Sequence, residues 1–272
     1  KARRAGVDQI LGGEKRRRAA ENRNLGAYAA QGKYIQFLDG DMTLASDWPK
    51  AAVDLLVERP EVAAVCGNLR EAGDGVWLRA LEIDWAPREG VIRHCGGAAM
   101  FRREPLIHFG GFPEDVKYGE EPLLCWRIRN ELEMSIYQLN RTMANHDLGH
   151  TGFVDYWRRN VRVGRTYAEI AGRCVRSADR LWYRESIVNA GWAALIVVAA
   201  ALLVAGPLWV ELAIFVGLLC IVGRKFLQAR GRGYPAEVAA VYAVHTYLCK
   251  LPLAWGELRW LLDNWGHGKA RS

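Results

Sequence analysis

The feature of this sequence that most limits its fold is a long stretch without charge. Residues Ser186 to Val210 contain no Asp, Glu, Lys or Arg over 25 residues. A helix needs about 20 mostly apolar residues to cross a bilayer. The run is therefore long enough for a membrane helix, and it separates a large N-terminal part of the chain from a short C-terminal part.

A second, shorter uncharged run covers residues 212–223, and Gly206 and Pro207 lie between the two runs. This pattern predicts a transmembrane helical hairpin over 186–223. Basic residues precede the first run and follow the second, as "RKFLQARGR", so the positive-inside rule places both ends of the hairpin in the cytosol. A third run, 238–249, is too short to span, which predicts an interfacial or protein-packed helix within a cytosolic or interfacial tail, 224–272.

The segment just before the hairpin is basic and aromatic. Residues 156–184 hold eight arginines against Glu169 and Asp179, interleaved with Trp and Tyr. The whole chain carries a net charge of +7 with a pI near 9.2, which by itself fits nucleic acid, an anionic ligand or a membrane surface. Because the arginines cluster beside the uncharged run and no nucleic-acid recognition motif is present, we expect membrane lipids as partners and no nucleic acid. Residues 156–185 are predicted to form amphipathic interfacial helices.

Residues 1–155 alternate short apolar runs with helical patterns, which is typical of an α/β fold with a mainly parallel sheet and helices on both faces. Expected strands are 7–11, 34–38, 62–67, 97–101 and 135–139, and expected helices are 14–31, 48–58 and 121–129. The chain starts at Lys1, inside what resembles the middle of a domain, so we expect a first βα unit to be missing. Six scattered cysteines without a C-x-x-C pair are expected to be reduced and mostly buried.

The stretch "YIQFLDGDM" places Asp39 and Asp41 after an apolar strand. Ligands bind beyond the carboxyl ends of strands in such sheets, and neighbouring carboxylates are stabilised by a hard divalent cation. The alternative is an Asp-Gly turn whose two acids are simply solvated.

The wider segment "AENRNLGAYAAQGKYIQFLDGDM" resembles the family-2 glycosyltransferases, nucleotide-sugar enzymes of the GT-A fold. That family has an A-R-N-x-G helix, a G-x-Y-I strand and a D-x-D motif in this order. The resemblance implies that Arg23, Asn24, Asp39 and Asp41 contact the nucleotide sugar. It also implies that Asp41, with Asp39, holds Mg²⁺ or Mn²⁺ against the donor diphosphate, although an arginine such as Arg23 can equally be a solvated surface residue.

The later segment, residues 95–129, resembles the acceptor half of the same family, with a G-G-F-x-E turn and an acidic pair that starts a helix. By that resemblance Glu121 is the catalytic base, with Glu120 beside it, and Gly96, Gly97 and Glu120 contact the acceptor. This sequence has Glu-Glu where Glu-Asp is commonest. The alternative is that the two acids only stabilise a helix N-terminus.

His146 follows the last expected strand, where the resemblance implies a third metal ligand, although a lone His is more often structural. The Q-x-x-R-W motif of processive polysaccharide synthases is absent. The sequence therefore predicts a membrane-anchored, inverting glycosyltransferase at the plasma or inner membrane, with a cytosolic catalytic domain (1–155) and a lipid-linked saccharide or surface polysaccharide as acceptor. The alternative is a noncatalytic membrane scaffold of the same fold.

Overall fold

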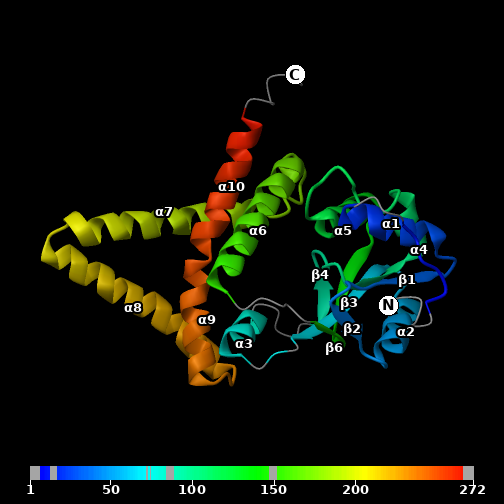
Figure 1. Ribbon diagram of the computed structural model, residues 1–272, viewed down its shortest axis with the longest axis horizontal. Coiled ribbons are helices and arrows are strands. Elements are labelled where there is room, and N and C mark those ends of the chain that lie inside the picture. The colour runs from blue at the N-terminus through cyan, green and yellow to red at the C-terminus, as the bar shows by residue number, and fades with distance from the viewer. Residues whose placement is uncertain are drawn as a thin grey trace. The chain divides into compact units, whose positions relative to one another are not determined.

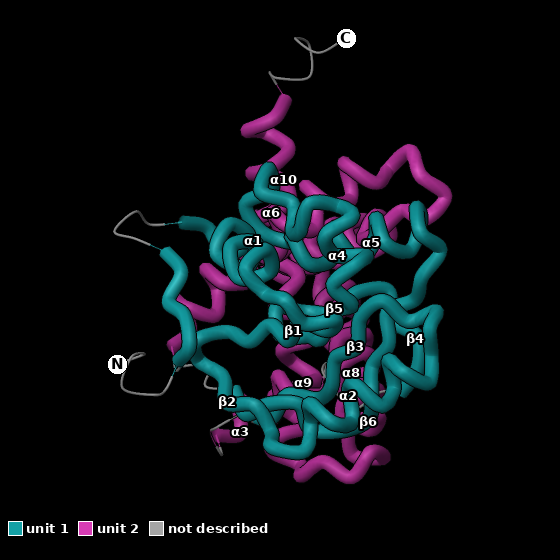
Figure 2. The backbone as a smooth tube through the Cα atoms, turned by 90° about the vertical axis from the view of Figure 1, so that its right-hand side faces the viewer, with its two compact units in different colours: residues 1–70, 87–146 teal, residues 71–86, 147–272 magenta. Residues whose placement is uncertain are grey.

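The computed structural model describes residues 7–12, 17–71, 73, 75–83, 89–146 and 152–265. The chain forms two compact units, residues 1–70 with 87–146 and residues 71–86 with 147–272, which are coloured separately in Figure 2. A short internal segment, 71–86, thus belongs with the C-terminal helices. The sequence predicted a domain boundary near residue 155 but gave no sign that segment 71–86 leaves the first unit.

The first unit is an α/β fold around a six-stranded sheet, with helices on its faces (Figure 1). Its helices are α1 (Ala19–Ala29), α2 (Trp48–Glu58), α4 (Arg103–His108) and α5 (Glu120–Glu131). Its strands are β1 (Tyr34–Phe37), β2 (Met42–Leu44), β3 (Val62–Glu71), β4 (Gly90–Ile92), β5 (Ala99–Arg102) and β6 (Ser135–His146). The helix predicted from Glu14 is described from Ala19 onward, and its predicted start lies outside the described residues.

The sheet has the order β1-β5-β3-β6-β2, with β4 also paired to β6. Strand β5 runs antiparallel to both β1 and β3, so those two are parallel to each other but are not neighbours. Strands β3 and β6 run in the same direction. The Ser135 amide donates to the Glu61 carbonyl where the two strands start, and the Asn68 side chain donates to the Asn140 side chain further along both. The predicted α/β class is confirmed. The prediction of a mainly parallel sheet was wrong, because the sheet is mixed. Alternation of helices and strands indicates the direction of successive strands, but it does not show which strand inserts between them.

The strand predicted at residues 7–11 was wrong, because residues 7–12 are irregular. Val7, Ile10 and Leu11 are about half exposed and have no sheet partner there. An apolar run forms a strand only when a neighbouring strand satisfies its backbone groups. The run was correctly read as apolar, but tertiary pairing decided its conformation.

The core of the first unit lies between the sheet and its helices. Its largest fully buried side chains include Trp48, Leu56 and Phe101. Helix α2 begins at Trp48 with Pro49 in its first turn, as predicted, because proline is pre-set for that position and needs no hydrogen-bond donor there. Phe37, Phe101 and Phe112 meet edge to face with ring centroids 5.0–5.8 Å apart, which ties β1, β5 and the turn before α5 together.

The second unit is helical. It comprises α3 (Val76–Glu82), α6 (Phe153–Cys174), α7 (Tyr183–Ala205), α8 (Leu208–Gly231), α9 (Ala236–Leu248) and α10 (Lys250–Asn264). Helices α6 and α10 pack backbone to backbone, since a Cβ at Gly164 would collide with the Leu253 carbonyl and one at Gly256 with the Val161 carbonyl. Close approach of this kind requires glycine at both crossing positions.

Among the described residues, one helix, α7, is long and apolar enough to cross a membrane, and almost none of its most apolar stretch is buried. Helix α8 follows after Gly206 and Pro207 but carries Glu211 in its first turn. The two helices of the predicted hairpin are present, and whether they span a bilayer stays a prediction. Helix α9 is packed within the protein through Val238, Ala239 and Tyr242. Of the interfacial and the protein-packed helix expected for residues 238–249, it is the protein-packed one.

The described cysteines are all free thiols, and Cys220 alone among them is exposed. This agrees with the expectation of reduced, mostly buried residues. In the core of the first unit the Sγ atoms of Cys95 and Cys125 lie 3.5 Å apart.

Candidate active site

The candidate site is organised around the guanidinium of Arg23 on α1. Its Nη2 lies 2.8 Å from Asp39 Oδ1, and its Nη1 lies 2.8 Å from Glu120 Oε1 and 2.6 Å from Glu121 Oε1. The Arg23 side chain is mostly buried against the ring of Phe112, 5.7 Å from its centroid. One cation thereby joins the two acidic motifs, which are about 80 residues apart in the sequence.

Asp39 and Asp41 are held by the turn that ends β1. The Met42 amide donates to the Asp39 carbonyl at 3.1 Å, which closes a tight turn over Gly40 and Asp41. Strand β2 then pairs with β6 so that Met42 lies opposite His146. This register brings Asp41 Oδ2 to 3.6 Å from His146 Nε2. The two aspartates therefore face different partners, Arg23 and His146.

Glu120 and Glu121 open helix α5, directly after Gly119. Gly119 has a φ of +86°, in the left-handed region that glycine adopts without strain. From the helix N-terminus both carboxylates reach Arg23. The same position also lets them stabilise the helix dipole, so the two alternative roles of these acids are compatible. Both side chains are largely buried, at 9% and 13% exposed.

Burial shifts the acid-base properties of the site. Desolvation raises the pKa of Glu121 above its ordinary value of 4.5, Arg23 acts to lower it, and Glu120 adds to the rise. Burial acts to lower the pKa of Arg23, but Glu121, Asp39 and Glu120 outweigh it, so the guanidinium stays charged. A carboxylate whose pKa is raised is a stronger base, which suits it to accept a proton.

Because Gly97 has no side chain, Arg23, Asp39 and Glu121 can lie close to its backbone. A Cβ at Gly97 would collide with the Arg23 Nη2 atom and would lie 2.7 Å from Asp39 Oδ2 and 3.1 Å from Glu121 Oε1. A Cβ at the neighbouring Gly96 would meet nothing within 4 Å. Of these two glycines, Gly97 is the one whose bare backbone touches the charged cluster.

Asn24, the residue after Arg23, is buried and faces the turn before α5. Its Nδ2 donates to the Phe112 carbonyl at 2.9 Å and to Glu114 Oε1 at 2.8 Å, and its Oδ1 accepts from the Phe112 amide at 2.7 Å. A Cβ at Gly111, which has a φ of +86°, would collide with Asn24 Oδ1. Asn24 thus fixes the turn that carries Phe112 under Arg23, while its predicted contact with a nucleotide sugar stays a prediction.

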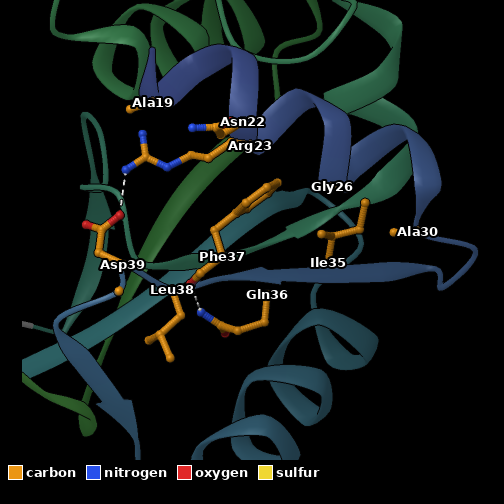
Figure 3. Close-up of a pocket in the computed structure, with 11 residues that line it drawn as sticks. Ala19, Asn22, Arg23, Gly26, Ala30, Ile35, Gln36, Phe37, Leu38 and Asp39 are labelled. Carbon is orange, nitrogen blue, oxygen red and sulfur yellow. Dashed lines mark hydrogen bonds and ion pairs between the residues drawn. The ribbon is translucent and has the colours of Figure 1, made fainter. Parts of the chain in front are cut away.

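A cavity of about 590 Å³ opens beside Arg23 and Asp39, between α1 and β1 (Figure 3). This volume is in the range of small-molecule sites. Figure 3 shows Asn22 and Arg23 of α1 across the opening from Phe37, Leu38 and Asp39. Its walls are formed by Ala19, Asn22, Arg23, Gly26, Ala30, Ile35, Gln36, Phe37, Leu38, Asp39 and Gly40.

A divalent cation such as Mg²⁺ or Mn²⁺ needs several oxygen or imidazole ligands. Over the described part of the chain, no group of three or more His, Cys, Asp or Glu side chains is placed to hold a metal ion. Asp41 and His146 do form a two-residue set of one carboxylate and one imidazole, ligands that Mn²⁺ accepts. Such a pair fits a cation whose other ligands come from a bound diphosphate or water.

The structure thus brings Arg23, Asp39, Glu120, Glu121 and Gly97 into one cluster and places Asp41 with His146 beside it. The sequence did not predict that Arg23 bridges both acidic motifs, and it missed Gly119 and Phe112 as supports. Phe112 and Glu114 lie in the quoted G-G-F-x-E turn, so the signal for them was present. Gly26, which lines the cavity, is the glycine of the A-R-N-x-G motif, whereas Asn22 had no signal beyond its place on α1.

Residues 9–110 match the family model described as glycosyl transferase family 2. The chain contains a family-2 glycosyltransferase domain. No curated protein matches the chain. The GT-A fold is supported by the mannosyltransferase PcManGT from Pyrobaculum calidifontis, solved in complex with GDP-Man and Mn²⁺, which is 18% identical, with 94% of this chain and 70% of that chain covered and a TM-score of 0.66.

Two further solved structures match this chain with lower TM-scores. A mycobacterial protein is 21% identical over 63% of this chain and 55% of that chain, with a TM-score of 0.41. Residues 1–349 of TarS from S. aureus are 15% identical over 92% of this chain and 72% of that chain, with a TM-score of 0.37.

Proposed function

We propose that this nucleotide-sugar glycosyltransferase is membrane-anchored, metal-dependent and inverting, and that it acts on a lipid-linked saccharide or surface polysaccharide. The observation that carries the proposal is the Arg23 cluster, in which the carboxylate of the D-x-D motif and the first two residues of α5 meet beside a cavity. A scaffold that had lost catalysis would not need both acidic motifs assembled on one cation.

The cavity is proposed to hold the donor nucleotide, with the diphosphate toward Asp41 and His146. One guanidinium faces three carboxylates at Arg23, so negative charge is in excess there and would repel a bare diphosphate. A divalent cation on Asp41 and His146, Mg²⁺ or Mn²⁺, would offset that repulsion and stabilise the charge that develops on the departing diphosphate. The Mn²⁺ and GDP-Man in the mannosyltransferase structure support testing that donor first.

Glu121 is proposed as the general base. It takes the proton of an acceptor hydroxyl as the hydroxyl oxygen attacks the anomeric carbon, and the bond from that carbon to the diphosphate oxygen breaks with its electron pair leaving on the nucleoside diphosphate. Arg23 holds Glu121 in place at 2.6 Å, and the bare backbone of Gly97 lies directly against both side chains. A single displacement of this kind inverts the anomeric configuration.

The membrane assignment rests on α7, with the basic residues before it on the cytosolic side. A cytosolic catalytic domain at the plasma or inner membrane would meet both soluble nucleotide sugars and acceptors carried by lipid. The two described helices α7 and α8 make a small anchor, which favours transfer to a lipid-linked acceptor over threading of a polymer.

The test measures nucleoside diphosphate release by the full-length protein in membranes, with a panel of nucleotide sugars, Mn²⁺ and a lipid-linked acceptor. We expect release that a chelator abolishes and that Asp41→Asn reduces about 100-fold or more, the usual cost of losing one charge-stabilising group. The matched control is Asp54→Asn, which removes an exposed carboxylate that pairs with Lys50 on the surface. Equal release by Asp41→Asn and Asp54→Asn would overturn the proposed role of Asp41 in holding the metal, and no release from any donor would instead favour the noncatalytic scaffold.

A further inference from the structure

Helix α10 is apolar on two opposite faces. One face carries Pro252, Leu253 and Gly256, which are buried, with Gly256 against the backbone of α6. The other face carries Trp255, Leu258, Leu262 and Trp265, which are 45–81% exposed. We call these four residues the outer stripe. Their spacing of three, four and three residues aligns them along one side of a helix.

The outer stripe lies on a helix that is fastened to α7 by buried hydrogen bonds. Asn189 Nδ2 donates to Glu257 Oε1 at 3.0 Å, and Lys250 Nζ donates to Asn189 Oδ1 at 2.8 Å. Asn189 and Glu257 are both buried. Asn189 is only two turns from the start of α7, so the attachment is at the beginning of the apolar helix and not along its length.

Helix α10 crosses α7 at this attachment. Figure 1 shows α10 running across α7 near the end where α7 begins. If α7 crosses a bilayer, a helix attached across its first turns lies along the membrane surface. The outer stripe then sits at the boundary between headgroups and acyl chains, where tryptophan is enriched.

The charges around this boundary match a lipid surface. Arg176, Arg180 and Arg184, just before the apolar part of α7, are exposed. Arg259 is also exposed, beside the outer stripe. Basic side chains at this level are attracted to anionic headgroups.

We propose that α10 is a membrane-surface helix whose outer stripe inserts shallowly into the lipid leaflet from which α7 enters. The inference rests on the proposed anchorage by α7 and adds a second contact of the helical unit with lipid, at the membrane surface. The occupant of the stripe is lipid. A second copy of the chain is the competing occupant, and the test separates the two.

The test uses variants of the full chain with one exposed cysteine each, made in a Cys220→Ser background, because the other five cysteines are buried. An environment-sensitive fluorophore is attached at Leu258→Cys or Leu262→Cys in vesicles of phosphatidylcholine and phosphatidylglycerol. Asn264→Cys, exposed on another side of α10, is the matched control, and Val198→Cys reports on the middle of α7. Quenching by aqueous iodide and by lipids spin-labelled at shallow and deep positions is measured for each.

We expect the Leu258 and Leu262 probes to be quenched by the shallow spin label and to be several-fold less sensitive to iodide than the Asn264 probe. Iodide sensitivity equal to that of Asn264, with the Val198 probe still quenched by the deep label, would overturn the inference and leave the anchorage intact. Protection from iodide without lipid quenching would assign the stripe to a second copy and would also overturn it. A Val198 probe open to iodide would show that the anchorage itself has failed.

Discussion

At the level of single residues, the site depends on one arginine that serves three carboxylates. Replacing the charge of Arg23 would leave Asp39, Glu120 and Glu121 facing one another. Salt bridges of this kind are costly to break from one side, because the remaining charges stay buried and unpaired. The cluster is therefore a unit, and its members are best probed through changes that leave Arg23 in place.

Glu121 should give transfer a distinctive dependence on pH. Its carboxylate must be ionised to take a proton, and burial raises its pKa above 4.5. Activity is therefore present above the raised pKa and is lost as pH falls through it, so the acid limb of the kcat profile should lie above the ordinary Glu value. Glu121→Gln should lower kcat by roughly 10²–10⁴-fold and remove this limb.

The matched control for that measurement is Glu131→Gln at the exposed end of the same helix. It changes the helix charge equally but is far from Arg23, and both kcat and the limb should be kept. An unchanged acid limb in Glu121→Gln would show that another group is the base.

Gly97 should tolerate no side chain. Gly97→Ala places a methyl group against Arg23 and Asp39, and overpacking of this kind costs about 1–3 kcal/mol. Thermal unfolding should show that loss, and nucleoside diphosphate release should fall more steeply because the charged cluster is displaced. Gly96→Ala, whose methyl group meets nothing within 4 Å, should unfold like the parent protein. Equal unfolding free energies for the two variants would contradict the packing described at Gly97.

At the level of elements, helix α1 links β1 to the turn before α5. Asn24 is the link, since its amide binds both backbone groups of Phe112 and the carboxylate of Glu114. The helix thereby supplies Arg23 to the site and, from the next residue, fixes the support under Arg23. Local sequence shows the helix, while the partner of each residue depends on the turn folding back against it.

Asn24→Ala should destabilise the first unit by about 1–3 kcal/mol, because the buried amide and carbonyl of Phe112 lose their partners. Chemical denaturation followed by fluorescence would measure the change in the free energy of unfolding. Asn22→Ala makes the same substitution at an exposed position of α1 and should stay within about 0.5 kcal/mol of the parent. A loss in Asn22→Ala as large as that in Asn24→Ala would mean that the helix itself, rather than the turn, is affected.

At the level of the whole molecule, the chain joins the α/β unit of a glycosyltransferase to a helical unit whose exposed apolar helix α7 is the proposed membrane anchor. A charge at the centre of a spanning helix costs about 2.5–3.5 kcal/mol. Leu195→Arg combined with Val198→Arg in α7 should therefore release the protein from membranes at alkaline pH, where the parent stays in the pellet. Leu227→Arg, at an exposed position near basic residues of α8, should stay in the pellet, and its release would argue against α7 as the anchor.

The sequence by itself determined the features that depend on neighbours along the chain. The uncharged runs, the start of α2 at Trp48 and the acidic turn after β1 follow from composition and local spacing, which survive without knowledge of the fold. The family resemblance supplied the order of the motifs and hence the GT-A class. It also named Gly97, Glu121 and His146 as candidates, although their roles stay predictions.

Only the tertiary structure decided which of these residues meet. The insertion of β5 between β1 and β3 made the sheet mixed, and the register of β2 on β6 placed His146 beside Asp41. Arg23 forms ion pairs with Glu120 and Glu121, and segment 71–86 packs with the helical unit. Contacts between distant parts of a chain depend on how whole elements pack, and the periodicity of each element reports only which of its faces is apolar.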